Sequence, residues 1–257
     1  MTQWTAFPHA GDYAFDAASV KKSWARLHQG DCEALPGEAA VLQAWVLFHN
    51  GEFQAAAQAG LQAGGQGITV ANKATSIYAN YLEVKEKNRL ALFLEVASRA
   101  EAQQALDPDN ANAWYWQAYA LGRYSQGISV AKALAQGLGG KVKQALEQTI
   151  RLSPRHAEAH IALATFHAEV IDKVGALIGC MTYGAKKDLG LSLYQAGLQF
   201  HSGCAIALME YANGMLMLEG DKSMAQATAL YEQAAAVPAA DAAERLGMDM
   251  ARAGLKD

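Results

Sequence analysis

The sequence predicts an all-α fold of stacked helix pairs, and three observations support this. Alanine, the strongest helix former, makes up about a fifth of the chain, whereas the β-branched residues that favour strands are scarce. The five prolines stand beside polar or glycine-rich stretches, where they end helices rather than kink them. With 257 residues, 52% of them apolar, the chain can bury a large core as one domain or one repeat array.

One motif occurs twice and indicates an internal repeat. Residues 106–114 and 152–160 share the pattern Leu-x-Pro-x-x-Ala-x-Ala-aromatic, with histidine in the last place of the second copy, at an interval of 46 residues. Each copy ends one helix, turns at the proline and begins the next helix. The helix that follows carries large or apolar residues at i, i+3, i+4 and i+7, which form one stripe.

The same stripe fits five predicted helices, and each places a small residue at its centre. These residues are Ala44, Ala79, Ala118, Ala164 and Ala212. Small side chains there let neighbouring helices approach closely. Successive alanines lie 35, 39, 46 and 48 residues apart, so the later repeats must contain longer helices or inserted loops.

This arrangement resembles the tetratricopeptide repeat (TPR), a helix-turn-helix unit of about 34 residues. The first repeat is the clearest example. Trp45, Gly51, Phe53 and Ala56 look like its first-helix aromatic, turn glycine, following aromatic and second-helix alanine. The resemblance implies a TPR-like helical-repeat solenoid of antiparallel helix pairs, with elongated later repeats and a C-terminal capping helix.

From about residue 105 onward, the chain is most similar to the TPR domain of the regulator of microtubule dynamics proteins and their bacterial relatives. Four features carry this resemblance: Gly122-Arg-Tyr, Phe166-His-Ala-Glu, Glu210-Tyr-Ala and a final helix after Pro238. A similar layout, including Tyr115-Trp116, occurs in the T component of tripartite (TRAP) solute transporters. These relatives imply binding functions.

We expect a single TPR-like α-solenoid domain over residues 1–257. Its expected elements are a helix at 16–29, helix pairs at 37–63, 68–106, 111–152, 156–200 and 204–236, and a cap at 239–254. Insertions at 125–140 and 171–187 enlarge two of the pairs. Each pair contacts mainly its neighbours, and the amphipathic final helix covers the open end.

Composition excludes several classes of function. The net charge of −4 offers no general footprint for nucleic acid. No apolar run approaches the roughly 18 residues of a membrane span, and residues 1–16 lack a signal-like segment, which favours a cytoplasmic protein without a leader. Cys32, Cys180 and Cys204 are odd in number and far apart, so they indicate neither disulfides nor a zinc site.

The sequence predicts no catalytic, cofactor-binding or metal-binding residues, and hence a protein that is not an enzyme. Residues 137–141 resemble a phosphate-binding loop but lack its first glycine, the Ser or Thr after the lysine, and a preceding strand. His156, His160 and His167 share a helix face, yet about 16 Å separates the outer two along the axis. We interpret the histidines as packing residues; metal binding or pH sensing is the alternative.

The candidate partner-binding residues lie on first helices of the repeats. They are Trp45, Phe48, Tyr115, Tyr119 and Arg123. We assign Trp114 to the packed stripe and Tyr115 and Tyr119 to the adjacent stripe, which faces the concave groove in the resembled family. An apolar, aromatic groove suits an amphipathic helix or an extended apolar segment.

We therefore expect a non-catalytic scaffold that binds a protein or peptide partner in this groove. One alternative is a groove already filled by one of the chain's own helices. Another is an accessory protein that holds an apolar small ligand, as the similarity to the T component implies. The oligomeric state stays open.

A second candidate surface is the apolar insertion Val174–Gly184, which contains Leu177 and Ile178. It lacks the caps and periodicity of a stable surface helix, and in water it would expose an apolar patch. We expect it to fold back over the protein, cover the groove, contact another subunit or make a weak contact with a membrane surface. Flanking Lys173, Lys186 and Lys187 suit an anionic lipid surface.

Overall fold

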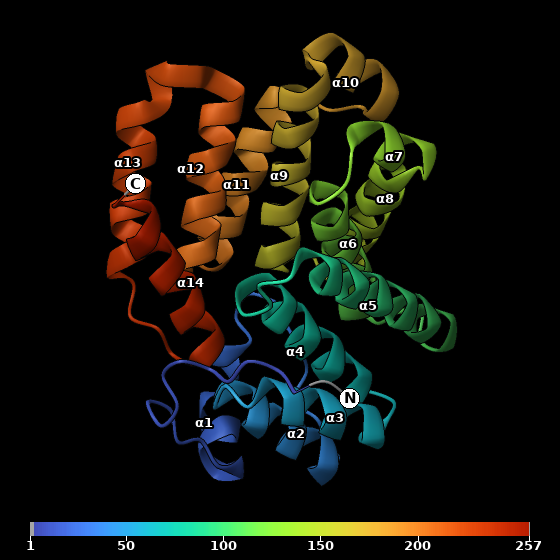
Figure 1. Cartoon of the computed structure of the whole chain (residues 1–257), viewed down its shortest axis with the longest axis vertical. Helices are drawn as coiled ribbons and strands as arrows, with labels where there is room; N and C mark the ends of the chain where they lie inside the picture. Colours follow the sequence, from blue (N-terminus) through green and yellow to red (C-terminus); the bar gives the residue numbers. More distant parts are fainter. Residues whose placement is uncertain (1–2, 257) are drawn as a thin grey trace. The chain divides into compact units, whose positions relative to one another are not determined.

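The computed structural model describes residues 3–256, and these are helical with no strand, which confirms the all-α prediction. Figure 1 shows the helices along the chain. Their bounds are α1 (Ala17–Leu27), α2 (Ala39–His49), α3 (Phe53–Ala63), α4 (Gly67–Tyr81), α5 (Glu86–Leu106), α6 (Ala111–Gln126), α7 (Val130–Ala135), α8 (Leu138–Leu152), α9 (Ala157–Val174), α10 (Ala176–Tyr183), α11 (Lys187–Phe200), α12 (Ala205–Glu219), the 3₁₀ turn η1 (Gly220–Ser223), α13 (Met224–Ala236) and α14 (Ala242–Gly254).

Helices that are adjacent in the chain, or separated by one short helix, pack against each other. The pairs are α2 with α3, α4 with α5, α6 with α8, α9 with α11, and α12 with α13. The short helices α7 and α10 occupy the two predicted insertions. This arrangement confirms a helical-repeat solenoid, in which the pairs that enclose α7 and α10 are the longest and the last pair, residues 205–236, is shorter.

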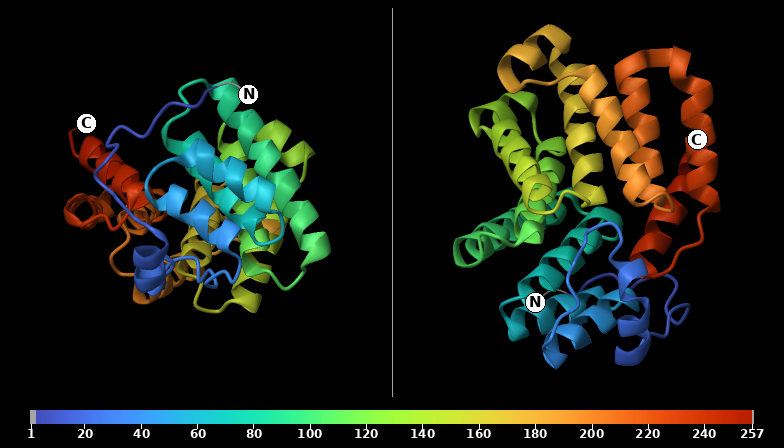
Figure 2. Two further views of the ribbon diagram at one scale, coloured as in Figure 1. Left: turned by 90° about the horizontal axis from the view of Figure 1, so that it is seen from below. Right: turned by 180° about the vertical axis from the view of Figure 1, so that it is seen from behind.

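The chain divides into two compact units. The first comprises the residues up to His28, Glu33–Leu152 and Asp241–Ala243, and the second comprises Gln29–Cys32, Ser153–Ala240 and the residues from Glu244 onward. Figure 2 gives two further views of the helices that make up each unit.

Small residues allow close helix packing within the first unit. Ala44 and Ala79 are fully buried and Ala118 is 1% exposed, as the stripe pattern predicts. The closest approach joins α3 to α4, where Gly60 faces Gly67. A Cβ on either glycine would lie 2.5 Å from the carbonyl oxygen of the other, so neither position has room for a side chain.

The second unit packs around Tyr194 of α11, whose side chain is fully buried. Its ring stacks on Tyr211 of α12 with a centroid distance of 5.0 Å. Ile161 and Ala164 of α9 and Met215 of α12 complete this cluster. Ala164 and Ala212 are both fully buried, so all five predicted alanines lie in the interior of a unit.

On α6, Ala118 and Leu121 of the predicted packing stripe are buried, but the assignments of Trp114 to the core and Tyr115 to an accessible groove are wrong. Trp114 is half-buried, and its indole N–H donates to the Pro108 carbonyl oxygen at 2.9 Å. Tyr115 is 4% exposed and Trp116 is 1% exposed. Because α6 packs against α4, α5 and α8, it buries more than one stripe, and the stripe assigned to the groove is among those buried.

The expectation that Val174–Gly184 does not form a stable surface helix is wrong, although no side chain caps the N-terminus of the helix that it forms. The segment contains α10, which packs on α9. Gly175 with φ +84° precedes the helix and Gly184 with φ +65° ends it, so two glycines in the left-handed region define its bounds.

Candidate functional site

Trp45 and Phe48 of α2 are fully buried, so neither side chain is accessible to a partner in this structure. The Trp45 ring makes edge contacts with Trp24 at 5.9 Å and with Phe48 at 5.5 Å between centroids. These two members of the predicted groove therefore pack beneath the surface of the first unit.

Lys73 of α4 lies among three aromatic rings and is 7% exposed. Its Nζ lies 5.8 Å from the Trp45 ring centroid, 5.6 Å from that of Phe48 and 6.0 Å from that of Trp116. Cation–π attraction of this kind is worth up to about 2 kcal/mol per contact when the cation is desolvated. Sequence reasoning missed Lys73, although it is the one charged residue between Gly67 and Tyr81.

Tyr119 and Arg123 are the accessible part of the predicted surface. Both are half-buried, whereas Tyr115, one turn earlier, is 4% exposed. The Arg123 guanidinium carbon lies 5.4 Å from the Tyr119 ring centroid. Tyr119 also contacts Trp116 at 5.3 Å and Phe93 at 6.4 Å, so the buried rings fix its position.

Several buried donors near these rings have no hydrogen-bond partner among residues 3–256. They include Nε1 of Trp45, Nε1 of Trp116 and Nδ2 of Asn72. An unsatisfied buried donor costs about 1–3 kcal/mol.

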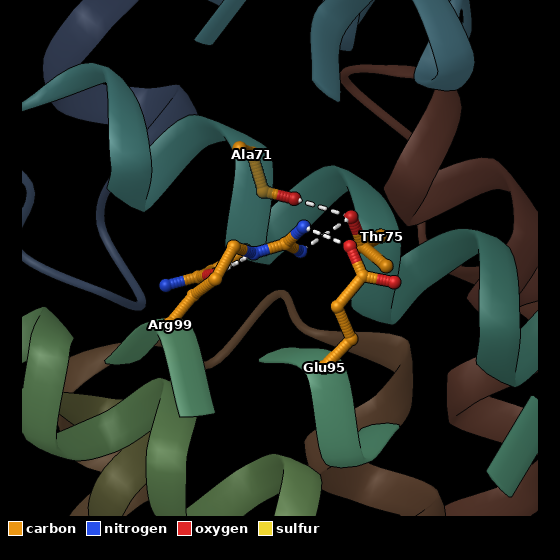
Figure 3. A network of polar contacts seen from close by, with 5 residues as sticks. Ala71, Thr75, Glu95 and Arg99 are labelled. Atoms are coloured by element: carbon orange, nitrogen blue, oxygen red, sulfur yellow. Dashed lines mark hydrogen bonds and ion pairs between the residues drawn. The ribbon is translucent and has the colours of Figure 1, made fainter. Parts of the chain in front are cut away.

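A polar network joins α4 to α5 beside these donors (Figure 3). The Arg99 guanidinium donates to Asn72 Oδ1 at 3.0 Å, to Thr75 Oγ1 at 2.9 Å and to Glu95 Oε1 at 2.6 Å. Burial lowers the pKa of Arg99, and the Glu95 carboxylate opposes that shift. The network fixes α5 against α4.

The three histidines on α9 make structural contacts, as the packing interpretation predicts. His156 Nδ1 accepts from the Ala159 N–H at 3.1 Å and caps the helix, and His160 Nδ1 lies 3.0 Å from the His156 carbonyl oxygen. His167 Nδ1 accepts from the Lys186 N–H at 3.4 Å. Among residues 3–256, no three His, Cys, Asp or Glu side chains group in a way that could hold a metal ion.

The outer face of α10 is apolar and exposed. Leu177 is 74% exposed, Ile178 57% and Met181 81%. The opposite face rests on α9, where the buried Gly179 contacts Val170. Lys173 pairs with Glu169 at 3.4 Å and Lys187 with Glu219 at 3.0 Å, so carboxylates partly neutralise the lysines that flank this helix.

Two titratable side chains of the second unit, Tyr194 and Cys204, have raised pKa values. Burial raises the pKa of Tyr194 far above its ordinary value, and the hydrogen bond with Thr165 opposes this only in part. Burial likewise raises the pKa of Cys204 to about 12. Neither group is ionised at neutral pH, which makes both poor nucleophiles.

In the part of the chain that the structure describes, no helix has the length and apolar character needed to cross a bilayer.

Comparison with known proteins supports the fold. The structure is similar to that of a thermophilic TPR protein of Thermus thermophilus, with a TM-score of 0.57 and 15% sequence identity. The match covers 83% of this chain and 97% of the other. No family model matches the sequence, and no curated protein matches it. At this identity the similarity shows the fold alone, and that fold is TPR-like.

Proposed function

We propose that this chain is a non-catalytic scaffold that binds a segment of a partner protein, and that Tyr119 and Arg123 on α6 contact that segment. The TPR-like fold supports a role in protein interaction at a coarse level. The observation that carries the proposal is the pairing of Arg123 with Tyr119 over a layer of buried aromatic rings. Tyrosine and arginine are among the residues that dominate binding energy at protein interfaces.

The buried members of the predicted surface have a supporting role in this proposal. Tyr115 and Trp116 hold the Tyr119 ring in place, at centroid distances of 6.1 Å and 5.3 Å. A ring fixed in this way loses little conformational entropy when a partner binds. The Arg123 guanidinium offers planar donors to a backbone carbonyl or a carboxylate of that partner.

A pull-down with two matched variants tests the proposal. Tyr119→Ala combined with Arg123→Ala should abolish capture of proteins that the unaltered chain retains. Leu106→Ser is the control, because Leu106 ends α5 and is 89% exposed. The control should retain the same proteins, and both variants should keep the helical circular dichroism spectrum. Retention of all partners by the double variant would remove this face of α6 from consideration.

The more specific relationships stay predictions. The similarity to the regulator of microtubule dynamics domain is a prediction from the sequence. The comparisons with known proteins do not support this more specific relationship. The alternative of an apolar small ligand has no support among the described residues. Native mass spectrometry of the purified chain checks that alternative directly, since a bound small molecule would add to the mass.

A further inference from the structure

Residues 3–15, called here the N-terminal arm, lead to α1 without helix or strand and make a turn at residues 8–11; Figure 2 shows them at the blue end of the chain. Two aromatic side chains anchor the arm to α3 and α4. The Trp4 ring stacks on Tyr78 of α4, with centroids 4.1 Å apart and an angle of 11° between the planes. Phe7 is 5% exposed and packs edge-on against Phe53 at 6.2 Å.

Side chains of the first unit bind the backbone of the arm at both ends. The Trp4 N–H donates to Gln54 Oε1 at 3.0 Å, and the Thr5 N–H donates to the Tyr78 hydroxyl at 3.4 Å. Asn50 holds Phe15 from both sides, because its Oδ1 accepts from the Phe15 N–H at 2.7 Å and its Nδ2 donates to the Phe15 carbonyl at 3.0 Å. Contacts to backbone groups bind an extended chain whatever its side chains are.

Gly51 makes the seat for Phe7. Its φ of +84° turns the chain between α2 and α3, and a Cβ there would lie 2.6 Å from Cδ1 of Phe7. The absence of a side chain therefore lets the phenyl ring lie directly on the backbone of the turn. The first unit thus accommodates two aromatic rings of the arm. Phe7 lies against Gly51, and Trp4, three residues earlier, stacks on the Tyr78 ring.

The arm is exposed to solvent along much of its length. Ala10, Gly11 and Asp12 are exposed, and a cleft of about 770 Å³ lies between the arm and the segment Asn50–Gln58. Phe7 is the one buried residue of the arm, and segments with few buried apolar contacts open at lower free-energy cost than a core does. Opening of the arm would expose mainly Phe7 and the stacked rings of Trp4 and Tyr78.

We propose that the surface formed by Asn50, Gly51, Phe53, Gln54 and Tyr78 is a peptide-binding site, and that the N-terminal arm is its intramolecular ligand. The partner that fits it is an extended segment with aromatic side chains at positions i and i+3, as in Trp4 and Phe7. The tethered arm has an effective concentration in the millimolar range, so it competes with such a partner. This site is separate from Tyr119 and Arg123 and goes beyond the function proposed above.

A fluorescent synthetic peptide of residues 3–15 tests the proposal on the full-length chain. In the variant Trp4→Ala combined with Phe7→Ala, the arm loses its anchors and the site becomes free. Fluorescence anisotropy should then show peptide binding at least about tenfold tighter than to the unaltered chain, since aromatic anchors carry most of such binding energy. A control peptide with alanine at both aromatic positions keeps the backbone groups but loses both anchors, so it should bind the double variant at least about tenfold more weakly.

Further variants make the result decisive. Adding Gln54→Ala to the double variant should weaken peptide binding, whereas adding Tyr119→Ala and Arg123→Ala should leave it unchanged, which separates this site from the one on α6. Trp4→Ala alone, which keeps Phe7 in its seat, replaces the double variant if that protein does not fold. Equal binding of the peptide and its alanine control, or no binding to a folded variant, would overturn the proposal.

Discussion

Replacing Trp116 with alanine should destabilise the protein much more than the same change at Trp114. The Trp116 side chain is 1% exposed, and an indole of this kind buries roughly 200 Å², worth about 5 kcal/mol at about 25 cal/mol per Å². Loss of its aromatic and cation–π contacts adds about 1–2 kcal/mol. Removal of the unpartnered Nε1 donor returns about 1–3 kcal/mol. The net loss is about 4 kcal/mol, within the usual range for deletion of a buried aromatic side chain.

Trp114→Ala is the matched control on the same helix. It removes a half-buried ring and one hydrogen bond to Pro108, so we expect a loss of about 1–2 kcal/mol. Urea unfolding followed by circular dichroism at constant pH measures both values. Equal losses, or a larger loss at Trp114, would refute the packing of α6 described above.

Three further predictions concern the second unit. Gly214→Ala should lower the melting temperature markedly, because the new Cβ would meet the Tyr194 hydroxyl and ring; the reverse result, an unchanged melting temperature, would show that Tyr194 is not where the structure puts it. Leu177→Ser with Ile178→Ser should leave the melting temperature nearly unchanged, since these side chains are 74% and 57% exposed. The double variant should reduce any self-association seen in light scattering and any sedimentation with anionic liposomes. If association also survives, the α10 surface has no binding role. Folding raises the pKa of the Cys204 thiol from its ordinary value of 9.0 to about 12, so the folded state binds the thiol proton more tightly than the unfolded state does. The stability that this group contributes should therefore be complete below pH 9 and decline as the pH rises toward 12. Urea unfolding at alkaline pH should show that Cys204→Ala removes this contribution to the decline.

The helix pairs could be predicted from the sequence because their signals are local. Helices end at the proline turns, Pro108 and Pro154, and neighbouring helices pack closely at the five central alanines. Both features can be recognised from the spacing of residues in the sequence. The burial of Ala44, Ala118 and Ala164 confirms that part of the reasoning.

Which side of a helix faces the solvent could not be predicted in the same way, because it depends on helices that are distant in the sequence. Tyr115 and Trp114 are neighbours with similar side chains, and only the positions of α4, α5 and α8 around α6 decide which of them is buried. The partners of Lys73 likewise come from helices far apart in the sequence, so no local pattern indicates its aromatic surroundings. The predicted groove therefore stays a prediction, and its accessible part is smaller than the stripe pattern suggested.

The N-terminal arm was missed for a related reason. Trp4, Phe7, Tyr13 and Phe15 are a dense set of aromatic residues for a segment without helical periodicity. That density could have indicated a docked segment. Its seat, however, depends on Gly51, Gln54 and Tyr78, which lie between about 35 and 75 residues away along the chain, and spacing alone does not bring them together.

Site-specific photo-crosslinking tests the central claim most directly, namely that the face of α6 at Tyr119 binds a protein. Tyr119 and, separately, Leu106 are replaced by the photo-crosslinking residue p-benzoylphenylalanine in cells that make the protein naturally. We expect irradiation to produce a covalent adduct of protein size from position 119 and none from position 106, which is 89% exposed on α5. No adduct from position 119, or the same adducts from both positions, would contradict the account.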